Sequence, residues 1–542
     1  MNIIKHSLAV LGLIAAPAFA ANQVSISIDA SRPGPVISKN VYGQFAEQLG
    51  TGIYGGMWVG TKSNIPNTRG WRNDVVGALK ALHVPLVRWP GGCFADTYHW
   101  RDGVGPQDKR PSNISDGRVE EINAVGTHEF FDLIDMLGAD AYINGNVGTG
   151  SVQEMADWVE YMTADGGSPL ARLRARNGHA KPFKVAYFGI GNELWGCGGN
   201  LKPDYYANLY SNYFKVAYFG IGNELWGCGG NLKPDYYANL YSNYENFLRA
   251  PGNSRPKMIA SGGSGFDTAW TDVLSKELKG RTVGISVHQY TIAGTTWEGK
   301  GKDLGFKEDE WISTLANTLK MDQLIKDHVA VLDKHDPEKK IGLMIDEWGT
   351  WYDEAGARSA LFQQNSLRDA LVAALNFHIF HAHAERVPMT TIAQMVNVLQ
   401  AMILTDKEKM VLTPTYYTFQ MYVPFQDARS LPLAIKDNTS YTMGATTIPG
   451  VSASASLAKD GKVYLALVNT DPHKAVDVAV DVAGAKVNAA AGKVLTSAAM
   501  DAHNTFQNPQ VIKPAAFSAR AAGGKLSIKV PAKAVMVVAL EE

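Results

Sequence analysis

Residues 341–349 read IGLMIDEWG, an apolar run that ends in the carboxylate of Glu347. Residues 185–196 read VAYFGIGNELWG and place Glu193 directly after a second apolar run. A solvated carboxylate at a strand edge is the simpler interpretation of each one alone. A carboxylate that follows a buried strand and precedes tryptophan is more often functional, and active sites of parallel barrels lie at the C-terminal ends of the strands. Both stretches therefore predict buried parallel strands, each with a candidate catalytic carboxylate at its C-terminal end.

Similar apolar runs alternate with amphipathic helices along most of the chain. Counting the two alternatives 185–191 and 216–222 once, there are eight strand candidates, and a chain of 542 residues is long enough for eight strand–helix units. This pattern predicts a (β/α)8 TIM barrel. A doubly wound open sheet is the alternative, but no glycine-rich dinucleotide motif follows the first strand. The strand candidates are Val41–Glu47, Val84–Pro90, Ala141–Val147, Val185–Gly191 or Val216–Gly222, Met258–Gly262, Val283–Tyr290, Ile341–Trp348 and Met389–Asn397. The helix candidates are Asn73–Leu82, Glu129–Leu137, Glu154–Met162, Trp311–Lys334 and Gln364–Ala384.

The sequence changes character after about Thr415. Short β-type runs follow, some of them separated by turn pairs such as Asp460-Gly461. They predict a C-terminal all-β sandwich (jelly-roll-like) domain, so the expected fold class is α/β, a barrel followed by a sandwich. The expected division is an N-terminal strand segment 21–40 that could join the sandwich, a catalytic barrel 41–414 and a sandwich 415–542. The runs are Val451–Leu457, Lys462–Val468, Val476–Val482 and Leu526–Val530.

The first twenty residues resemble a secretory signal peptide. Leu8–Ala16 is apolar but too short to span a bilayer, and Ala18-Phe19-Ala20 matches the small-x-small cleavage pattern. We therefore expect a cleaved leader, a secreted or periplasmic protein, and no membrane attachment of the mature form. Lys and Arg number 51 against 52 Asp and Glu, which argues against an electrostatic nucleic-acid partner.

A perfect duplication interrupts this organisation. Residues 183–213 and 214–244 are identical, so Glu193 and Glu224 are copies of one another. We expect only one copy to occupy the fourth barrel strand. If the second copy does, the first bulges from the face opposite the active site, whereas a hybrid of the two copies would put the extra residues at the active-site mouth. The second copy runs without a break into its helix, which favours Glu224; the first keeps its upstream context, Ala180–Pro182, which favours Glu193.

Carboxylates at the ends of two strands are the minimum apparatus for glycoside hydrolysis. Glu193 or Glu224 would protonate the leaving oxygen, and Glu347 would attack the anomeric carbon or activate water. His288 and Tyr290 are two residues apart on one strand and therefore share a face, from which they could hydrogen-bond to Glu347.

Other chemistries find less support in the sequence. His381 and His383 are two apart on a predicted helix and diverge, and neither a helical HExxH motif nor a paired-cysteine set is present, so no metal site is predicted. The stretch Gly262–Phe266 approaches a nucleophile elbow but has phenylalanine in place of the closing glycine.

Taken together, the motifs resemble glycoside hydrolase family 51, the α-L-arabinofuranosidases, from about Val41 to the C-terminus. The resemblance implies a barrel and sandwich, retention of configuration, and exo-acting release of arabinofuranosyl residues from arabinoxylan-type or arabinan-type saccharides. It implies no metal or organic cofactor, and it is compatible with a homo-oligomer, since family members often form one. The motifs are GQFAE (43–47), RWPGG (88–92), DGVGP (102–106), the two GNE copies, His288-x-Tyr290, DEW (346–348) and QMVNV (394–398).

Carried over residue by residue, the resemblance implies Glu347 as nucleophile and Glu193 or Glu224 as acid/base. Arg88 and His288 would support the carboxylates. The implied sugar-binding residues are Glu47, Cys93, Asn192 or Asn223, Tyr290, Trp351 and Gln394.

Cys93 departs from the family pattern, which often has asparagine there, so one sugar hydrogen bond would be lost or made differently. Cys93 and Cys197 or Cys228 would lie on the same barrel face, and we hypothesise a disulfide between them. Two small apolar fillers are the alternative.

Two other functions remain open at this point. An endo-β-1,4-glucanase occurs in the same family, and comparison of arabinofuranoside with glucan substrates separates the two activities. A catalytically impaired carbohydrate-binding protein would result if the duplication spoiled the fourth strand, and it would bind sugar without turnover.

Overall fold

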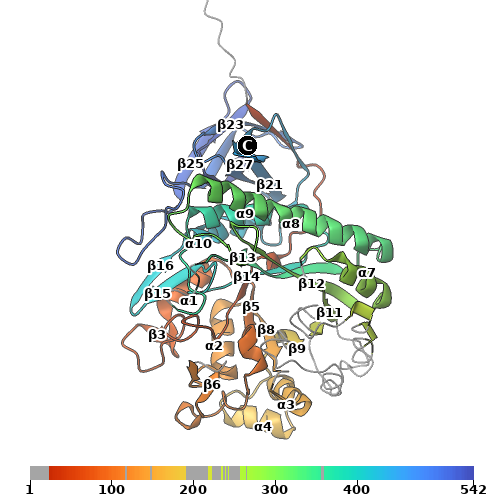
Figure 1. Ribbon diagram of the computed structural model, residues 1–542, viewed down its shortest axis with the longest axis vertical. Helices are drawn as coiled ribbons and strands as arrows, with labels where there is room; N and C mark the ends of the chain where they lie inside the picture. The colour runs from red at the N-terminus through yellow and green to blue at the C-terminus, as the bar shows by residue number, and fades with distance from the viewer. Residues whose placement is uncertain are drawn as a thin grey trace, which may run out of the picture.

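The computed structural model describes residues 23–115, 119–146, 149–190, 218–221, 233–235, 238, 239, 242, 257–263, 265–353, 355 and 359–542. Figure 1 shows two parts, a strand-rich domain in blue at one end and a barrel at the other, with the long helices α8 (Glu308–His335) and α9 (Leu367–Ala382) between them. The predicted fold class, a (β/α)8 barrel with a C-terminal β-domain, is confirmed.

The barrel sheet is closed and its neighbouring strands run parallel. Every predicted strand region contributes one of its members, because each is a run of apolar, often β-branched residues that can be buried on both faces. In sheet order the strands are β2 (Gly43–Phe45), β5 (Leu86–Trp89), β8 (Asp140–Gly145), β9 (Val185–Ile190), β10 (Tyr218–Ile221), β11 (Lys257–Ser261), β12 (Thr282–Thr291), β13 (Gly342–Thr350) and β14 (Met389–Ala393).

Both copies of the duplicated segment lie in this sheet, as β9 and β10. They pair in parallel so that identical residues are neighbours, from Tyr187 with Tyr218 to Ile190 with Ile221. The expectation that one copy would bulge out of the barrel is therefore wrong. Identical strands have identical hydrogen-bonding capacity, and pairing satisfies backbone groups that an expelled apolar strand would leave to solvent. The duplication gives the barrel a ninth strand.

Helices follow the strands and cover the barrel, including all five predicted ones. Sequence signals set several of their ends: the Ser151 hydroxyl accepts from the Glu154 N–H at the start of α3, and α2 ends at Gly138 with φ 69°. The helices besides α8 and α9 are α1 (Asn73–Ala81), α2 (Thr127–Leu137), α3 (Val152–Thr163), α4 (Pro169–Arg176), α7 (Thr268–Glu277) and α10 (Pro414–Met421). Within the described part of the chain, no helix has the length and apolarity needed to cross a membrane.

The strand-rich domain consists of two main sheets packed around a separate apolar core. The N-terminal strand β1 (Val24–Asp29) pairs antiparallel with β18 (Leu433–Lys436) and parallel with β23 (Val476–Ala483), and β26 (Leu526–Val530) completes its sheet. The second sheet has the order β17 (Arg429–Ser430), β21 (Val451–Leu457), β22 (Val463–Asn469), β27 (Ala534–Glu541), β24 (Ala489–Leu495) and β25 (Ala515–Arg520). The remaining strands form short hairpins: β3 (Asn67–Thr68) with β4 (Trp71–Arg72), β6 (Asn113–Ser115) with β7 (Val119–Glu121), β15 (Ile403–Asp406) with β16 (Lys409–Leu412), and β19 (Ser440–Met443) with β20 (Thr446–Pro449).

Two buried histidines of α9 join the barrel to the sandwich. His378 Nδ1 lies 2.8 Å from the Ser452 hydroxyl, and His381 Nδ1 lies 2.9 Å from the Ser454 hydroxyl on strand β21. Burial lowers the pKa of His378 to about 3 and places the pKa of His381 well below its usual value. Both imidazoles are therefore neutral, and they interact with the serines through hydrogen bonds alone.

This interface predicts acid lability. Below about pH 6.5 the unfolded chain protonates both histidines while the folded protein does not, so the free energy of unfolding should fall by about 1.4 kcal/mol per pH unit for each. For His378 this loss of unfolding free energy begins near pH 6.5 and ends near pH 3. Urea unfolding between pH 7 and 4 should show a shallower decline for the His378→Gln/His381→Gln variant. Replacement of the exposed His83 by glutamine should leave the wild-type slope, and an equally steep decline in the double variant would contradict the prediction.

Candidate active site

The carboxylate of Glu347 lies at the C-terminal end of β13 and is only 7% exposed. Arg88 Nη1 donates to its Oε1 at 3.0 Å, and the Tyr290 hydroxyl donates to its Oε2 at 3.2 Å. A buried carboxylate with a cation on one oxygen and a hydroxyl on the other is held in a fixed orientation. These contacts fix a carboxylate oxygen at the C-terminal end of a barrel strand.

A second carboxylate, Asp346, shares His288 with Glu347. His288 Nε2 lies 3.1 Å from Asp346 Oδ1, and its Nδ1 lies 3.6 Å from Glu347 Oε2. Adjacent strand residues normally face opposite sides, but the register shifts between Ser286 and His288 opposite β13, and again between Ile345 and Trp348 opposite β14. Burial alone would raise the pKa of Asp346, yet the hydrogen bond and charge of His288 hold it below its usual value.

Arg88 is buried at the end of β5 and is held on several sides. Its Nε donates to Asn144 Oδ1 at 3.1 Å, and its guanidinium lies 4.6 Å from the centre of the Phe45 ring. Burial by itself would lower the pKa of Arg88, but the neighbouring Tyr142 and Glu347 raise it above its usual value. The cation that faces Glu347 is therefore permanent.

Glu47 forms the other side of the site with Gln394. Strands β14, β2 and β5 are neighbours, so the loops that follow them meet, and Gln394 Nε2 donates to Glu47 Oε2 at 2.8 Å. Burial raises the pKa of Glu47 to about 7, with a further contribution from the charge of Glu347 and an opposing one from the Gln394 hydrogen bond. At neutral pH this carboxyl can therefore donate as well as accept a hydrogen bond.

The glycines of the RWPGG motif make room for Glu47. A Cβ on Gly91 would lie 2.3 Å from Glu47 Cγ, and a Cβ on Gly92 would lie 2.7 Å from Glu47 Oε1. Gly91 also has φ 124°, a conformation that other residues rarely adopt. The two glycines therefore allow the loops after β2 and β5 to approach each other closely.

Replacement of Gly91 by alanine should displace Glu47 and destabilise the protein. The expected loss of unfolding free energy is about 3 kcal/mol, from steric overlap and from the positive φ. Urea unfolding measures it, and activity should fall with it because Glu47 lines the site. The matched control is Gly77→Ala in α1, where a Cβ meets nothing within 4 Å. There the higher helix propensity of alanine should raise the free energy of unfolding by about 1 kcal/mol. A Gly91→Ala variant as stable as the wild type would contradict this explanation.

Aromatic side chains form the outer wall of the site. The rings of Tyr290 and Trp351 lie 5.3 Å apart and nearly perpendicular, at 79°.

Two residues of the site were not predicted from the sequence, Trp297 in the loop after β12 and Asn144 at the end of β8. The isolated polar residue in the apolar strand 140–145 was a usable signal for Asn144, whereas Trp297 has no signal in its local pattern.

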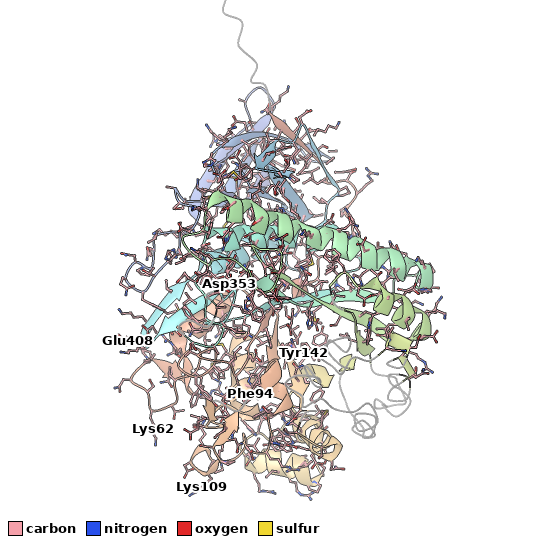
Figure 2. All side chains as sticks on the ribbon, viewed as in Figure 1. Lys62, Phe94, Lys109, Tyr142, Asp353 and Glu408 are labelled. Carbon is pink, nitrogen blue, oxygen red and sulfur yellow. The ribbon has the colours of Figure 1, made fainter. Side chains whose placement is uncertain are left out.

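The structure thus brings Arg88, His288, Tyr290, Glu347 and Trp351 together, and places Glu47 and Gln394 beside them. Tyr142, labelled in Figure 2, has its ring centre 5.7 Å from the Arg88 guanidinium. Cys93 begins a short 3-10 helix after β5, but its side chain is not among those described. The disulfide hypothesis remains a prediction. Predicted residues outside the described part of the chain are Asn192, Glu193, Cys197, Asn223, Glu224 and Cys228.

No group of three or more metal-binding side chains gathers in the described residues. The described site instead offers carboxylates, a fixed cation and aromatic faces at the C-terminal ends of barrel strands. This fold and this site define a glycoside hydrolase of the barrel type.

Comparisons with known proteins narrow that class. Residues 78–213 match the α-L-arabinofuranosidase 1 domain, and residues 346–534 match the α-L-arabinofuranosidase C-terminal domain. An intracellular exo-α-L-arabinofuranosidase of Bacteroides ovatus is 43% identical, covering 98% of this chain and 99% of the relative. The crystal structure of the GH51 arabinofuranosidase of Xanthomonas axonopodis pv. citri has a TM-score of 0.86 at 48% identity, covering 96% of this chain and 100% of that one. The arabinose complex of the Thermotoga maritima α-L-arabinofuranosidase has a TM-score of 0.75 at 27% identity, with 96% and 100% covered. The chain belongs to glycoside hydrolase family 51, the α-L-arabinofuranosidases.

The comparisons correct one prediction, that of an exported protein, secreted or periplasmic, with a cleaved leader. The Bacteroides ovatus relative, which aligns with almost the whole chain, is named an intracellular enzyme. A short apolar run followed by Ala-Phe-Ala meets the export pattern by composition alone, and composition does not specify a compartment.

Proposed function

We propose that this protein is a retaining, exo-acting α-L-arabinofuranosidase that releases terminal arabinofuranosyl residues from arabinose-containing saccharides. The observation that carries the proposal is the buried Glu347 carboxylate, held by Arg88 and Tyr290 at the end of β13. Family membership and the exo-α-L-arabinofuranosidase of Bacteroides ovatus support the substrate.

In this mechanism Glu347 attacks the anomeric carbon while the acid/base glutamate protonates the leaving oxygen. The resulting arabinosyl–enzyme ester is hydrolysed when the same glutamate deprotonates a water molecule. Arg88 and Tyr290 hold one carboxylate oxygen each, so Glu347 needs little reorganisation before attack. Glu47 and Gln394 offer hydrogen bonds to the sugar hydroxyls, and Trp351 offers an apolar face. We assign catalysis to the barrel, 41–414, because these residues all lie at its strand ends.

We propose Glu224 as the acid/base, with Glu193 as the alternative. Strand β10, which precedes Glu224, is separated from β13 by two strands, β11 and β12, as the fourth strand is from the seventh in an eight-stranded barrel. Strand β9, which precedes Glu193, keeps the corresponding spacing on the other side of the barrel, and the matched arabinofuranosidase 1 domain ends at residue 213 with the first copy. The uninterrupted run from the second copy into its helix region favours Glu224.

The test is release of nitrophenol from an aryl α-L-arabinofuranoside by the full chain, with NMR of the first-formed sugar anomer. Retained configuration is expected, and inverted configuration would exclude the covalent mechanism. Glu224→Gln should then abolish turnover, whereas Glu193→Gln should not; the reverse result assigns the role to Glu193. Hydrolysis of β-1,4-glucan without arabinose release, or sugar binding without turnover, would overturn the proposal.

A further inference from the structure

Trp297 stands out among the described apolar side chains because it is 54% exposed yet packs on the active-site wall. It lies in the loop after β12, the strand that carries Tyr290. Its ring centre is 5.5 Å from that of Trp351 at 76°, and 6.5 Å from that of Tyr290 at 65°. Trp297 is therefore the outermost of three rings that lead from the nucleophile to solvent.

The loop that carries Trp297 is held in place by Asp353. The two carboxylate oxygens of Asp353 accept the backbone N–H groups of Lys300 and Gly301, each at 3.0 Å. In return, the Asp353 N–H donates to the Gly301 carbonyl at 2.8 Å. Lys300 Nζ also donates to the Trp297 carbonyl at 2.7 Å. Asp353 lies in the stretch just beyond β13, near the centre of the view in Figure 2, so this clamp ties the Trp297 loop to the strand that carries Glu347.

A single exposed aromatic ring is ordinary by itself, but Trp297 also packs on Trp351 and Tyr290, which line the site. A tryptophan has an apolar face that suits the C–H face of a sugar ring. The edge-on contacts of Trp297 with Tyr290 and Trp351 fix the orientation of its indole ring. An exo-acting enzyme binds one sugar inside the site, and the rest of the saccharide must leave through the mouth. The ring nearest solvent, Trp297, borders that exit.

We propose that Trp297 is a specificity-determining residue that binds the saccharide leaving group, and that Asp353 is a positioning residue that holds the Trp297 loop against Trp351. This inference rests on the proposed function, because it assumes that arabinose occupies the inner site. The enzyme then prefers oligosaccharides over glycosides with a small leaving group, and this preference comes from outside the inner sugar site.

The experiment compares two substrates, methyl α-L-arabinofuranoside, whose leaving group is too small to reach Trp297, and arabinotriose. Trp297→Ala should raise KM for arabinotriose about tenfold, the value of roughly one aromatic contact, and lower kcat/KM for the methyl glycoside by a clearly smaller factor. Trp297→Phe should restore most of the arabinotriose KM. Thermal unfolding checks separately that the variant is folded.

Asp353→Ala should also raise KM for arabinotriose more than it affects the methyl glycoside, but by a smaller factor, because it frees the loop without removing the ring. Asp108→Ala, at a carboxylate 76% exposed, is the matched control and should change neither substrate. Equal effects of Trp297→Ala on both substrates, or no effect on either, would overturn the inference while leaving the proposed function intact. A wild-type enzyme that hydrolyses neither substrate would overturn the proposed function and this inference with it.

Discussion

Replacement of Glu347 by glutamine should lower kcat by about 10⁴-fold or more, because the amide cannot form the glycosyl ester. Glutamine has the size of glutamate and can keep a hydrogen bond to Tyr290, so the fold should survive. The measurement is single-turnover hydrolysis of an aryl α-L-arabinofuranoside, with thermal unfolding as a check on the fold.

The matched control is Glu408→Gln, on the β15–β16 hairpin at the edge of the molecule, where the label in Figure 2 marks an exposed carboxylate. It should retain wild-type kcat. A Glu347→Gly variant supplied with azide should form an arabinofuranosyl azide of inverted configuration, since azide then attacks from the side of the missing carboxylate. Activity of Glu347→Gln within tenfold of the wild type would exclude Glu347 as the nucleophile.

Arg88→Met should cost both stability and activity. It would leave the buried Glu347 carboxylate without its cation, and removing one partner of a buried pair costs about 3–5 kcal/mol of unfolding free energy. The expected fall in kcat/KM is roughly 100-fold or more, the size seen when one electrostatic partner at a reacting centre is lost. Urea unfolding and steady-state kinetics measure the two effects separately.

A surface ion pair provides the control for Arg88. Arg69 lies 2.6 Å from Asp132, but its side chain is 55% exposed, so Arg69→Met should cost less than about 1 kcal/mol. It should leave kcat/KM unchanged. If Arg88→Met were as mild as Arg69→Met, the ion pair with Glu347 would not be what orients the nucleophile.

Much of the site could be predicted because it follows strand ends. The apolar runs before Arg88, Glu347 and Gln394 are local signals, and the parallel barrel brings their C-terminal ends to one face whatever the details of packing. The period-two spacing of His288 and Tyr290 likewise predicted that both would reach Glu347, and both lie beside it.

Three features could not be predicted from local pattern. The close contact of His288 with Asp346, rather than with Glu347 alone, depends on register shifts along β13 that strand periodicity does not encode. Trp297 joins the site through a loop whose conformation depends on Asp353, more than fifty residues away along the chain. The raised pKa of Glu47 depends on burial between three loops.

The barrel, the C-terminal β-domain and the residue types at each strand end follow from local patterns, because strand and helix periodicities are local and the barrel converts them into one common face. The place of the duplicated segment, in contrast, depends on how the strands pair in the folded protein. Two identical strands carry the same local signal, so no pattern can rank them; the sheet accommodates both because each satisfies the backbone hydrogen bonds of its neighbour. The same holds for Glu47, Asp346 and Trp297, whose environments arise from contacts between segments that are distant in sequence.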